Sequence, residues 1–535
     1  SIKDAFSVDK VTKEFYKDIA NWYFWTVDNC KFPESAENID NGRNIAVIRL
    51  ITRIIFIWFM KELNLVPSNL FNKKYIESIL LENSNDESAY YKAILQNLFF
   101  ATLSTPKEQR RFTDETRHIK GHNDDFGNQN VFRFHEFYKN PEHIKSYFED
   151  IPFLNGGLFE CLDISRENQY VDGFTRRKQY QAHVPDYLFF SGEREANLNH
   201  WYDTKDKKYV VKGLLEILSA YNFTVDENTA DDADIALDPE LLGKVFENLL
   251  ASFNPETSTT ARKATGSFYT PREIVDYMVT ESLKEYFRTH LKETTDIENK
   301  FESLFNHALD INPFIDGSRD TKNLVNLIEN VRIVDPAVGS GAFPMGILNK
   351  LVFILNKIDK GNKLWKDAQL RSVENIQDSS LREETRGHIE NYFQNKNPDY
   401  GRKLYLIQRC IYGVDIQQIA VEISKLRFFI SLLVDEKIDK TKENWGIEPL
   451  PNLDFKIMQG NSLLEEYEGI KLFDESLFKS IDDNKEHQLK ILRRKQKDLE
   501  KEVLKLNSEN KYTNEAKKEY AKKLEDVSKK IEALL

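Results

Sequence analysis

The chain has 535 residues, of which 40% are hydrophobic and 30% charged, and its formal net charge is −12 at pH 7. This composition excludes a disordered chain and is typical of a soluble globular protein with two or three domains. No apolar run reaches membrane length and no secretory signal is present, so we expect a cytoplasmic protein without membrane segments. A nucleic-acid enzyme usually has a basic face, and the net negative charge argues against one here. The exceptions are a chain whose basic residues are gathered on one face and a chain that lacks the main DNA-binding part. Because the chain starts at Ser1 and not at methionine, we expect a trimmed or expressed fragment.

The amino-terminal region, residues 1–236, has a mostly helical pattern, and we predict a helical domain there. One apolar helix is predicted from Ile45 to Leu63. Its arginines, Arg43, Arg49 and Arg53, are interpreted as a solvated or salt-bridged face, with contact to DNA phosphates as the alternative. The three cysteines of the chain are too scattered to predict a metal site or a disulfide framework.

A second domain is predicted to begin at residue 237. Leu237 to Phe253 reads as a helix with an apolar stripe, which is more typical of a core than of a ligand site. The segment Gly266 to Arg272 then leads into a helix predicted from Glu273 to Phe287. Thr270 is the expected N-cap, with Pro271 at the first helical position. The free N–H groups and the positive dipole end of such a helix suit a carboxylate, for example that of methionine.

The stretch from Val331 to Phe343 carries the clearest motif of the sequence, and the other predicted elements of the second domain are placed relative to it. A short apolar strand is predicted to end at Asp335-Pro336, and Gly339 and Gly341 then permit a tight turn into an apolar helix that ends at Ile358. Strand, turn and helix form the first half of a nucleotide-binding α/β unit.

The details of this stretch favour one class of ligand. A dinucleotide fingerprint would need a third glycine at the position that Pro344 occupies. The Asp335 carboxylate would repel a pyrophosphate, but it would attract the ammonium of a methionine moiety, as in S-adenosylmethionine (SAM). The alternative is an ordinary strand-to-helix turn that a carboxylate closes.

Two further strands are predicted downstream. Cys410 to Ile416 is a short strand with an acid near its end, and a helix from about Gln418 to Val434 follows. An acid at that place, here Asp415, can accept both ribose hydroxyls of a nucleoside. The third strand, Phe455 to Met458, leads to the polar segment Gly460 to Leu463, and ligands bind beyond the carboxyl ends of strands in open α/β sheets.

These segments together resemble the amino-terminal portion of a γ-class, adenine-specific (N6) DNA methyltransferase. The resemblance covers nearly the whole chain and is closest to the large fused methylases of type IIG restriction–modification systems. Gly266 to Arg272 matches the family's motif X, Asp335 to Phe343 matches motif I, Gly413 to Ile416 matches motif II, and Gly460 to Ser462 resembles motif III. Motif X before motif I is the order of the γ class.

The resemblance implies a SAM-dependent transfer of a methyl group to the exocyclic amine of an adenine that is flipped out of double-stranded DNA. DNA would be bound through the full-length protein, and no metal is expected. Asn461 and Ser462 are possible contacts to the target base. The residues expected at the cofactor are Phe268, Tyr269, Thr270, Pro271, Asp335, Pro336, Ala337, Gly339, Gly341, Phe343, Asp415, Ile416 and Asn461.

The sequence departs from the family at the catalytic motif IV, Asn/Asp-Pro-Pro-Tyr/Phe. No such tetrapeptide occurs in the 535 residues. In its place, the chain ends in a charged helical hairpin with a turn at 507–514, and we expect the fragment to stop inside an insertion before motif IV. The expected apolar seams of this hairpin are formed by Leu492, Leu499, Val503 and Leu506 on one helix and by Tyr520, Leu524, Val527 and Ile531 on the other.

The predicted architecture is therefore α/β. It comprises a helical domain at 1–236, an incomplete doubly wound methyltransferase sheet at 237–475 and a helical hairpin at 476–535. The parent protein is expected to be a DNA adenine methyltransferase, and the fragment alone is expected to be inactive. The alternatives are a non-catalytic SAM-binding or interaction module and a SAM-dependent methyltransferase of RNA or protein.

Overall fold

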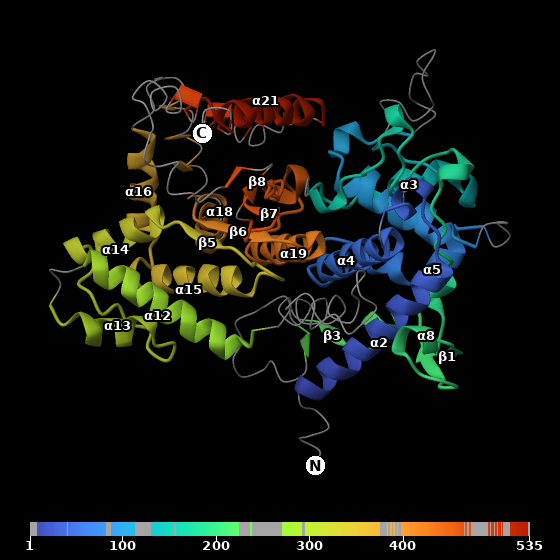
Figure 1. Cartoon of the computed structure of the whole chain (residues 1–535), viewed down its shortest axis with the longest axis horizontal. Coiled ribbons are helices and arrows are strands. Elements are labelled where there is room, and N and C mark those ends of the chain that lie inside the picture. Colours follow the sequence, from blue (N-terminus) through green and yellow to red (C-terminus); the bar gives the residue numbers. More distant parts are fainter. Residues whose placement is uncertain are drawn as a thin grey trace. The chain divides into compact units, whose positions relative to one another are not determined.

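Two units make up the chain in the computed structural model, residues Ser1–Gln459 and residues Gly460–Leu535 (Figure 1). The structure describes residues 8–39, 41–81, 87–112, 130–154, 157–223, 236–237, 270–291, 295–374 and 397–464, with shorter stretches between 382 and 393 and between 466 and 532. The predicted helix over Leu237 to Phe253 lies outside these residues, except for its first position. Within the described part, no helix combines the length and the apolar character that a membrane crossing requires.

Long buried helices dominate the amino-terminal part of the first unit. They are α2 (Val8–Asn29), α4 (Gly42–Glu62) and η2 (Tyr90–Leu103), which is a π-helix. The predicted helix from Ile45 to Leu63 is confirmed as α4, and its side chains from Ala46 to Met60 are all buried because apolar residues occur on every side of it.

Short elements connect these helices. β1 (Arg194–Ala196) and β2 (Tyr209–Val211) pair antiparallel, and β3 (Asn222–Phe223) and β4 (Ala236–Leu237) pair parallel. The other elements are α3 (Glu34–Glu37), η1 (Ser68–Phe71), α5 (Lys73–Ile79), η3 (Lys107–Gln109), η5 (His135–Phe137), η6 (Pro141–His143), α6 (Ile144–Phe148), η7 (Gly157–Phe159), η8 (Ser165–Glu167), η9 (Lys178–Tyr180), α7 (Tyr187–Phe190), α8 (Asn199–Tyr202) and α9 (Leu214–Ser219).

The arginines of α4 all form ion pairs. The salt-bridged interpretation of this helix is therefore confirmed. The alternative, contact with DNA phosphates, is wrong for Arg49 and Arg53, because both side chains are buried among protein groups. The three pairs are Arg43–Glu37 at 2.6 Å, Arg53–Asp172 at 2.7 Å and Arg49–Glu422 at 3.8 Å.

A parallel sheet follows in the order β5 (Ile333–Asp335), β6 (Ile411–Asp415) and β7 (Ile457–Gln459). All three strands were predicted, and a mixed α/β fold is confirmed; the completion of a doubly wound sheet stays a prediction. The helices of this part are α12 (Arg272–His290), α13 (Ile297–Phe305), α14 (Arg319–Asn330), α15 (Ala342–Ile358), α16 (Lys363–Val373), α18 (Pro398–Arg409), α19 (Gln418–Val434) and η11 (Glu443–Gly446).

One face of this sheet is covered and the other is largely open. Helices α15, α18 and α19 pack against β6. By register, Ile411, Gly413 and Ile457 share one face, and all three are buried. On the opposite face, Val334 is 66% exposed and Met458 is 42% exposed. Among the described residues, no strand pairs with the outer edge of β5.

The helical part and the sheet part belong to the same compact unit. Helix α4 packs against α19. The Asn444 side chain accepts a hydrogen bond from the Phe153 N–H at 2.6 Å and donates one to the Phe153 carbonyl at 2.8 Å. The Leu450 N–H donates to the Leu154 carbonyl at 2.6 Å. The boundary predicted at residue 236 therefore separates two parts of one compact unit, and the division into three domains stays a prediction.

The second unit contains a small hairpin of β8 (Glu466–Tyr467) and β9 (Ile470–Lys471) and a long helix, α21 (Asn514–Glu532). The described residues between 491 and 506 are also helical. Val503 and Val527 are buried, as expected for the two apolar seams, and the Tyr520 hydroxyl donates to Glu502 at 3.2 Å. The turn predicted at 507–514 lies outside the described residues, except for its last position.

We predict that deletion of Asp482 to Leu535 changes the melting temperature of the remaining chain by less than about 3 °C. The reason is that the deleted part belongs to a separate unit whose helices are mostly charged and have thin apolar seams. Differential scanning calorimetry of the full and the shortened chain measures this. Loss of the cooperative transition in the shortened chain would show that the hairpin is integral to the fold.

Candidate functional site

Helix α12 begins at Arg272, one residue before the predicted helical range Glu273 to Phe287 and one residue after the predicted first helical position, Pro271. Its N-cap is Pro271, without a side-chain capping hydrogen bond, and Arg272 is the first helical residue. The prediction that Thr270 is the N-cap and Pro271 the first helical residue is therefore wrong. Pro271 has an extended ψ of 146°, which its fixed φ allows, and its carbonyl accepts the first helical hydrogen bonds. The motif X residues Phe268 and Tyr269 lie outside the described residues.

The predicted strand, turn and helix around motif I are confirmed. Asp335 is the last residue of β5, and its Oδ1 accepts a hydrogen bond from the Ala337 N–H at 3.0 Å. Gly339 and Gly341 have φ values of 52° and 86°, a region that glycine enters at little cost. The Gly341 N–H donates to the Val338 carbonyl at 2.9 Å, which closes the turn before α15 starts. We refer to Val338–Gly341 as the glycine turn.

Asp415, at the end of β6, holds the glycine turn in place. Its Oδ2 accepts a hydrogen bond from the Gly339 N–H at 2.8 Å, and its Oδ1 accepts one from the Gln417 N–H at 2.8 Å. The two acidic motifs are thus joined directly, because β5 and β6 are adjacent parallel strands. A carboxylate has about four acceptor positions, so Asp415 keeps capacity for hydroxyl donors.

Asp335 is the electrostatically unusual group of this region. Its Oδ2 is buried and has no hydrogen-bond partner among the residues that the structure describes. Burial raises the pKa of the Asp335 carboxyl, and the nearby Asp415 charge raises it further. A buried carboxylate oxygen without a partner is costly, and a cation at that place would remove the cost. The residues present therefore fit a ligand that carries an ammonium group.

Helix α12 is held close to α15 by a glycine. A Cβ added to Gly346 would lie 2.7 Å from Cγ1 of Val275, so only glycine permits this helix spacing. The buried ammonium of Lys350 on α15 also pairs with Asp276 on α12 at 2.5 Å. These contacts fix the start of α12, which carries Thr270 and Pro271, relative to the helix that follows motif I.

The other expected cofactor residues differ in their exposure. Pro336, Ala337 and Ile416 are exposed, and Phe343 is half-buried. Asn461 and Ser462 are exposed residues of the second unit, where the Asn461 Oδ1 accepts a hydrogen bond from the Leu463 N–H at 3.0 Å. Their roles toward a cofactor or a base stay predictions.

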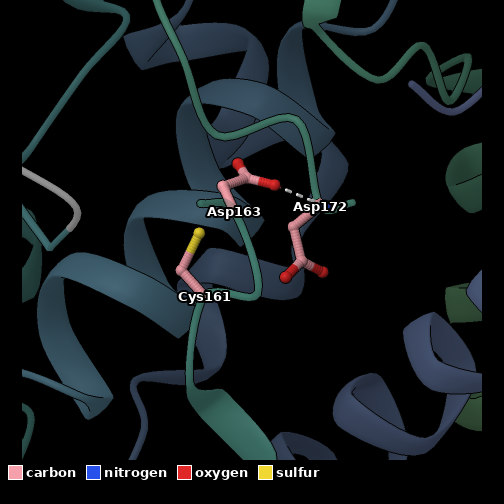
Figure 2. Close-up of side chains that lie close together, drawn as sticks. All are labelled: Cys161, Asp163 and Asp172. Carbon is pink, nitrogen blue, oxygen red and sulfur yellow. Dashed lines mark hydrogen bonds between the residues drawn. The ribbon is translucent and has the colours of Figure 1, made fainter. Parts of the chain in front are cut away.

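A buried polar cluster, formed by Cys161, Asp163 and Asp172, was not predicted from the sequence (Figure 2). The Asp163 carboxylate accepts hydrogen bonds from consecutive backbone N–H groups at 2.7 to 3.1 Å. The donors are Val171, Asp172, Gly173 and Phe174. Asp172 in turn pairs with Arg53 and accepts a hydrogen bond from the Leu162 N–H.

The residue types of this cluster are those of a metal site, but its hydrogen bonds and ion pair are those of a group that stabilises the fold. One ligand atom from each of its three residues lies within 4.8 Å of the others. Both carboxylates, however, already accept several hydrogen bonds, and the Arg53 guanidinium supplies the positive charge. We therefore assign the cluster to the folding of the loop at 161–174. The sequence contains no signal for it, because Arg53 lies 119 positions before Asp172.

Comparisons with known proteins address the nature of the site. Residues 409–532, which contain Asp415, match the family model described as Eco57I restriction-modification methylase. The chain is 26% identical over 468 residues to a protein of Methanocaldococcus jannaschii described as a candidate type II restriction enzyme and methyltransferase. The findings support a restriction–modification methylase. That alignment covers 86% of this chain but only 30% of the archaeal relative, so the chain spans less than a third of that protein. No solved structure matches.

Both comparisons thus agree with the resemblance inferred from the motifs, as a similarity to restriction–modification methylases. The matched region begins just before β6 and runs through α19, β7 and most of the second unit. The charged hairpin therefore lies inside the part that the family model describes. Adenine specificity and the γ class stay predictions.

We predict that Asp163 makes the stability of the fold depend on pH. Burial, and then the Asp172 charge, raises the pKa of Asp163 to about 6, above the value of about 3.9 in an unfolded chain. Its contribution to the free energy of unfolding is therefore fully present below pH ~4 and is lost as the pH rises through ~6. At about 1.4 kcal/mol for each pKa unit, the loss should be on the order of 3 kcal/mol.

Urea denaturation of the native chain and of Asp163→Asn, at several pH values between about 4 and 7, isolates this contribution. Other carboxyl groups titrate in both proteins, so the quantity to compare is the difference between the two unfolding free energies. That difference should fall as the pH rises. A constant or rising difference would contradict the assignment.

Proposed function

We propose that this chain binds SAM and forms the cofactor-binding part of an adenine-N6 DNA methyltransferase of a restriction–modification system. One observation carries the proposal. At the carboxyl ends of two adjacent parallel strands, the buried Oδ2 of Asp335 has no partner in the described part of the chain, and Asp415 lies beside it across the glycine turn. Ligands of open α/β sheets bind at this edge, and a cationic nucleoside suits two carboxylates that accept hydrogen bonds.

Each residue of the site has a role that follows from its chemistry. Asp335 would hold the ammonium of the cofactor, because no described residue donates a hydrogen bond to its Oδ2. Asp415 would accept the ribose hydroxyls with its remaining lone pairs. The carboxylate would be bound by helix N–H groups that have no partner inside their own helix, either those at the start of α12, as the sequence predicts, or those at the start of α15. The exposed Ile416 would give an apolar contact to the adenine ring. SAM itself supplies the activated methyl group.

The choice of DNA as substrate rests on the comparisons and on motif order. The archaeal relative is described as a type II restriction enzyme and methyltransferase candidate. Motif X before motif I, which is typical of the γ class, favours the adenine amine as acceptor. Asn461 and Ser462 could contact the target base, but the tetrapeptide that polarises the amine is absent from these 535 residues. The site therefore supports cofactor binding and leaves the transfer step to groups that these residues do not encode.

We predict that SAM or S-adenosylhomocysteine raises the melting temperature of the chain. A ligand at a hundredfold excess over its Kd adds about 2.7 kcal/mol to the stability of a protein that binds it only when folded. Asp335→Asn should reduce this shift, yet leave the melting temperature without ligand unchanged or higher, because it removes a buried charge. Asp415→Ala should also reduce the shift, and it should destabilise the free chain by releasing Gly339.

Scanning calorimetry with and without ligand measures both effects, with NAD as the control ligand. Stabilisation by NAD and not by SAM would overturn the proposed cofactor. An undiminished SAM shift in Asp335→Asn would show that the ammonium binds elsewhere.

We also predict that the 535-residue chain does not methylate DNA by itself. Loss of the groups that position and polarise the amine typically costs several orders of magnitude in rate. The measurement is transfer of label from tritiated SAM to an adenine-rich duplex, beside a longer chain that carries an Asn-Pro-Pro-Tyr or related motif and a recognition domain. Comparable rates for the two proteins would show that the catalytic groups lie within these 535 residues, against the prediction.

A further inference from the structure

Helix α19 occupies a central position in the first unit. It packs against β6 and β7 on the sheet and against α4 and α15. It follows Asp415 after only two residues, so its start is tied to the site. A helix in this place can act on the glycine turn through its own side chains.

Two side chains of α19 contact the glycine turn. Ser424 and Arg427 are three positions apart, and residues with that spacing lie on the same side of a helix. A Cβ added to Gly341 would lie 2.6 Å from the Ser424 hydroxyl, so Gly341 rests against this side chain. The Arg427 Nη1 donates a hydrogen bond to the Ser340 carbonyl at 3.2 Å, and Arg427 and Ser340 are both buried.

These contacts fix the peptide between Ser340 and Gly341 at both ends. Its carbonyl accepts from Arg427, and its N–H donates to the Val338 carbonyl. The preceding Gly339 N–H is held by Asp415. Helix α15 starts at the next residue, so this peptide sets the direction of the first N–H groups of that helix.

We propose that Arg427 is a positioning residue for the cofactor, one that holds the glycine turn in its binding conformation through the Ser340 carbonyl. The proposal rests on the proposed function, since it concerns the same site. Arginine suits this role because its planar guanidinium reaches a buried carbonyl with a fixed donor direction, which the flexible lysine ammonium does not reproduce.

The test compares Arg427→Met and Arg427→Lys with Lys425→Met in the full chain. Lys425 lies on the same helix, but its ammonium pairs with Asp454 at 2.8 Å, away from the hydrogen bonds that hold the glycine turn among the described residues. Calorimetric titration measures the Kd for SAM, and amide hydrogen exchange measures protection of residues 338–342 without ligand. A buried acceptor that loses its donor should weaken SAM binding about tenfold in Arg427→Met. Arg427→Lys should bind SAM with intermediate affinity, and Lys425→Met should bind like the native chain.

The exchange measurement separates this proposal from a purely structural role. Selective loss of protection at residues 338–342 in both Arg427 variants, with weaker SAM binding, supports the proposal. A lower melting temperature with unchanged Kd and unchanged protection in the turn overturns it. Should Arg427→Met not fold, Arg427→Lys decides the question with the same two measurements. If the native chain itself does not bind SAM, the proposed function fails, and the positioning role falls with it even where the exchange result shows that Arg427 holds the turn.

Discussion

The hydrogen bond from the Gly339 N–H to the Asp415 carboxylate is the contact on which the candidate site depends. It joins two motifs that lie 76 residues apart in the sequence. Hydrogen bonds to charged groups contribute about 1.5–3 kcal/mol, and this one also sets the conformation of the glycine turn. The pairing of β5 with β6 makes the bond possible. Asp335 is left at the strand end with one buried oxygen to which no described residue donates a hydrogen bond. The proposed chemistry of the site follows from that arrangement.

The helical amino-terminal part packs against the sheet part within one compact unit. Its α4 helix reaches α19 through packing and the Arg49–Glu422 pair. A second connection uses Asn444 and Trp445, whose φ values of 46° and 57° are costly for residues with side chains. The conformation is retained because the Asn444 side chain makes three hydrogen bonds to the backbone, two of them to Phe153. Arg49 and Arg53 of α4 thus belong to the interior of the protein, which argues against contact of these two side chains with a nucleic acid.

Local signals allowed much of the sheet and of the candidate site to be predicted from the sequence. Glycines after an apolar strand predicted the turn at Gly339, and the apolar run after Asp415 predicted α19 with the bounds that are observed, Gln418–Val434. Contacts between distant segments could not be predicted this way. The Asp163 cluster depends on Arg53 from another helix, and Arg427 reads as an ordinary charged residue within an apolar helix. The N-cap of α12 was misassigned because proline suits either of two adjacent positions.

The close approaches at glycine have an evolutionary consequence. An added Cβ would lie 2.7 Å from Val275 at Gly346, 2.8 Å from Val338 at Gly413 and 2.6 Å from the Ser424 hydroxyl at Gly341. At Gly346 the obstructing atom is the Cγ1 of Val275, and a smaller residue there would make room. At Gly413 the Cβ of Val338 and the Cδ1 of Ile457 would also lie 3.0 Å away. Among homologues, Gly346 is therefore expected to change only together with Val275, and Gly413 is expected to change more rarely. Gly341 has no such freedom, since its positive φ disfavours any side chain whatever residue replaces Ser424.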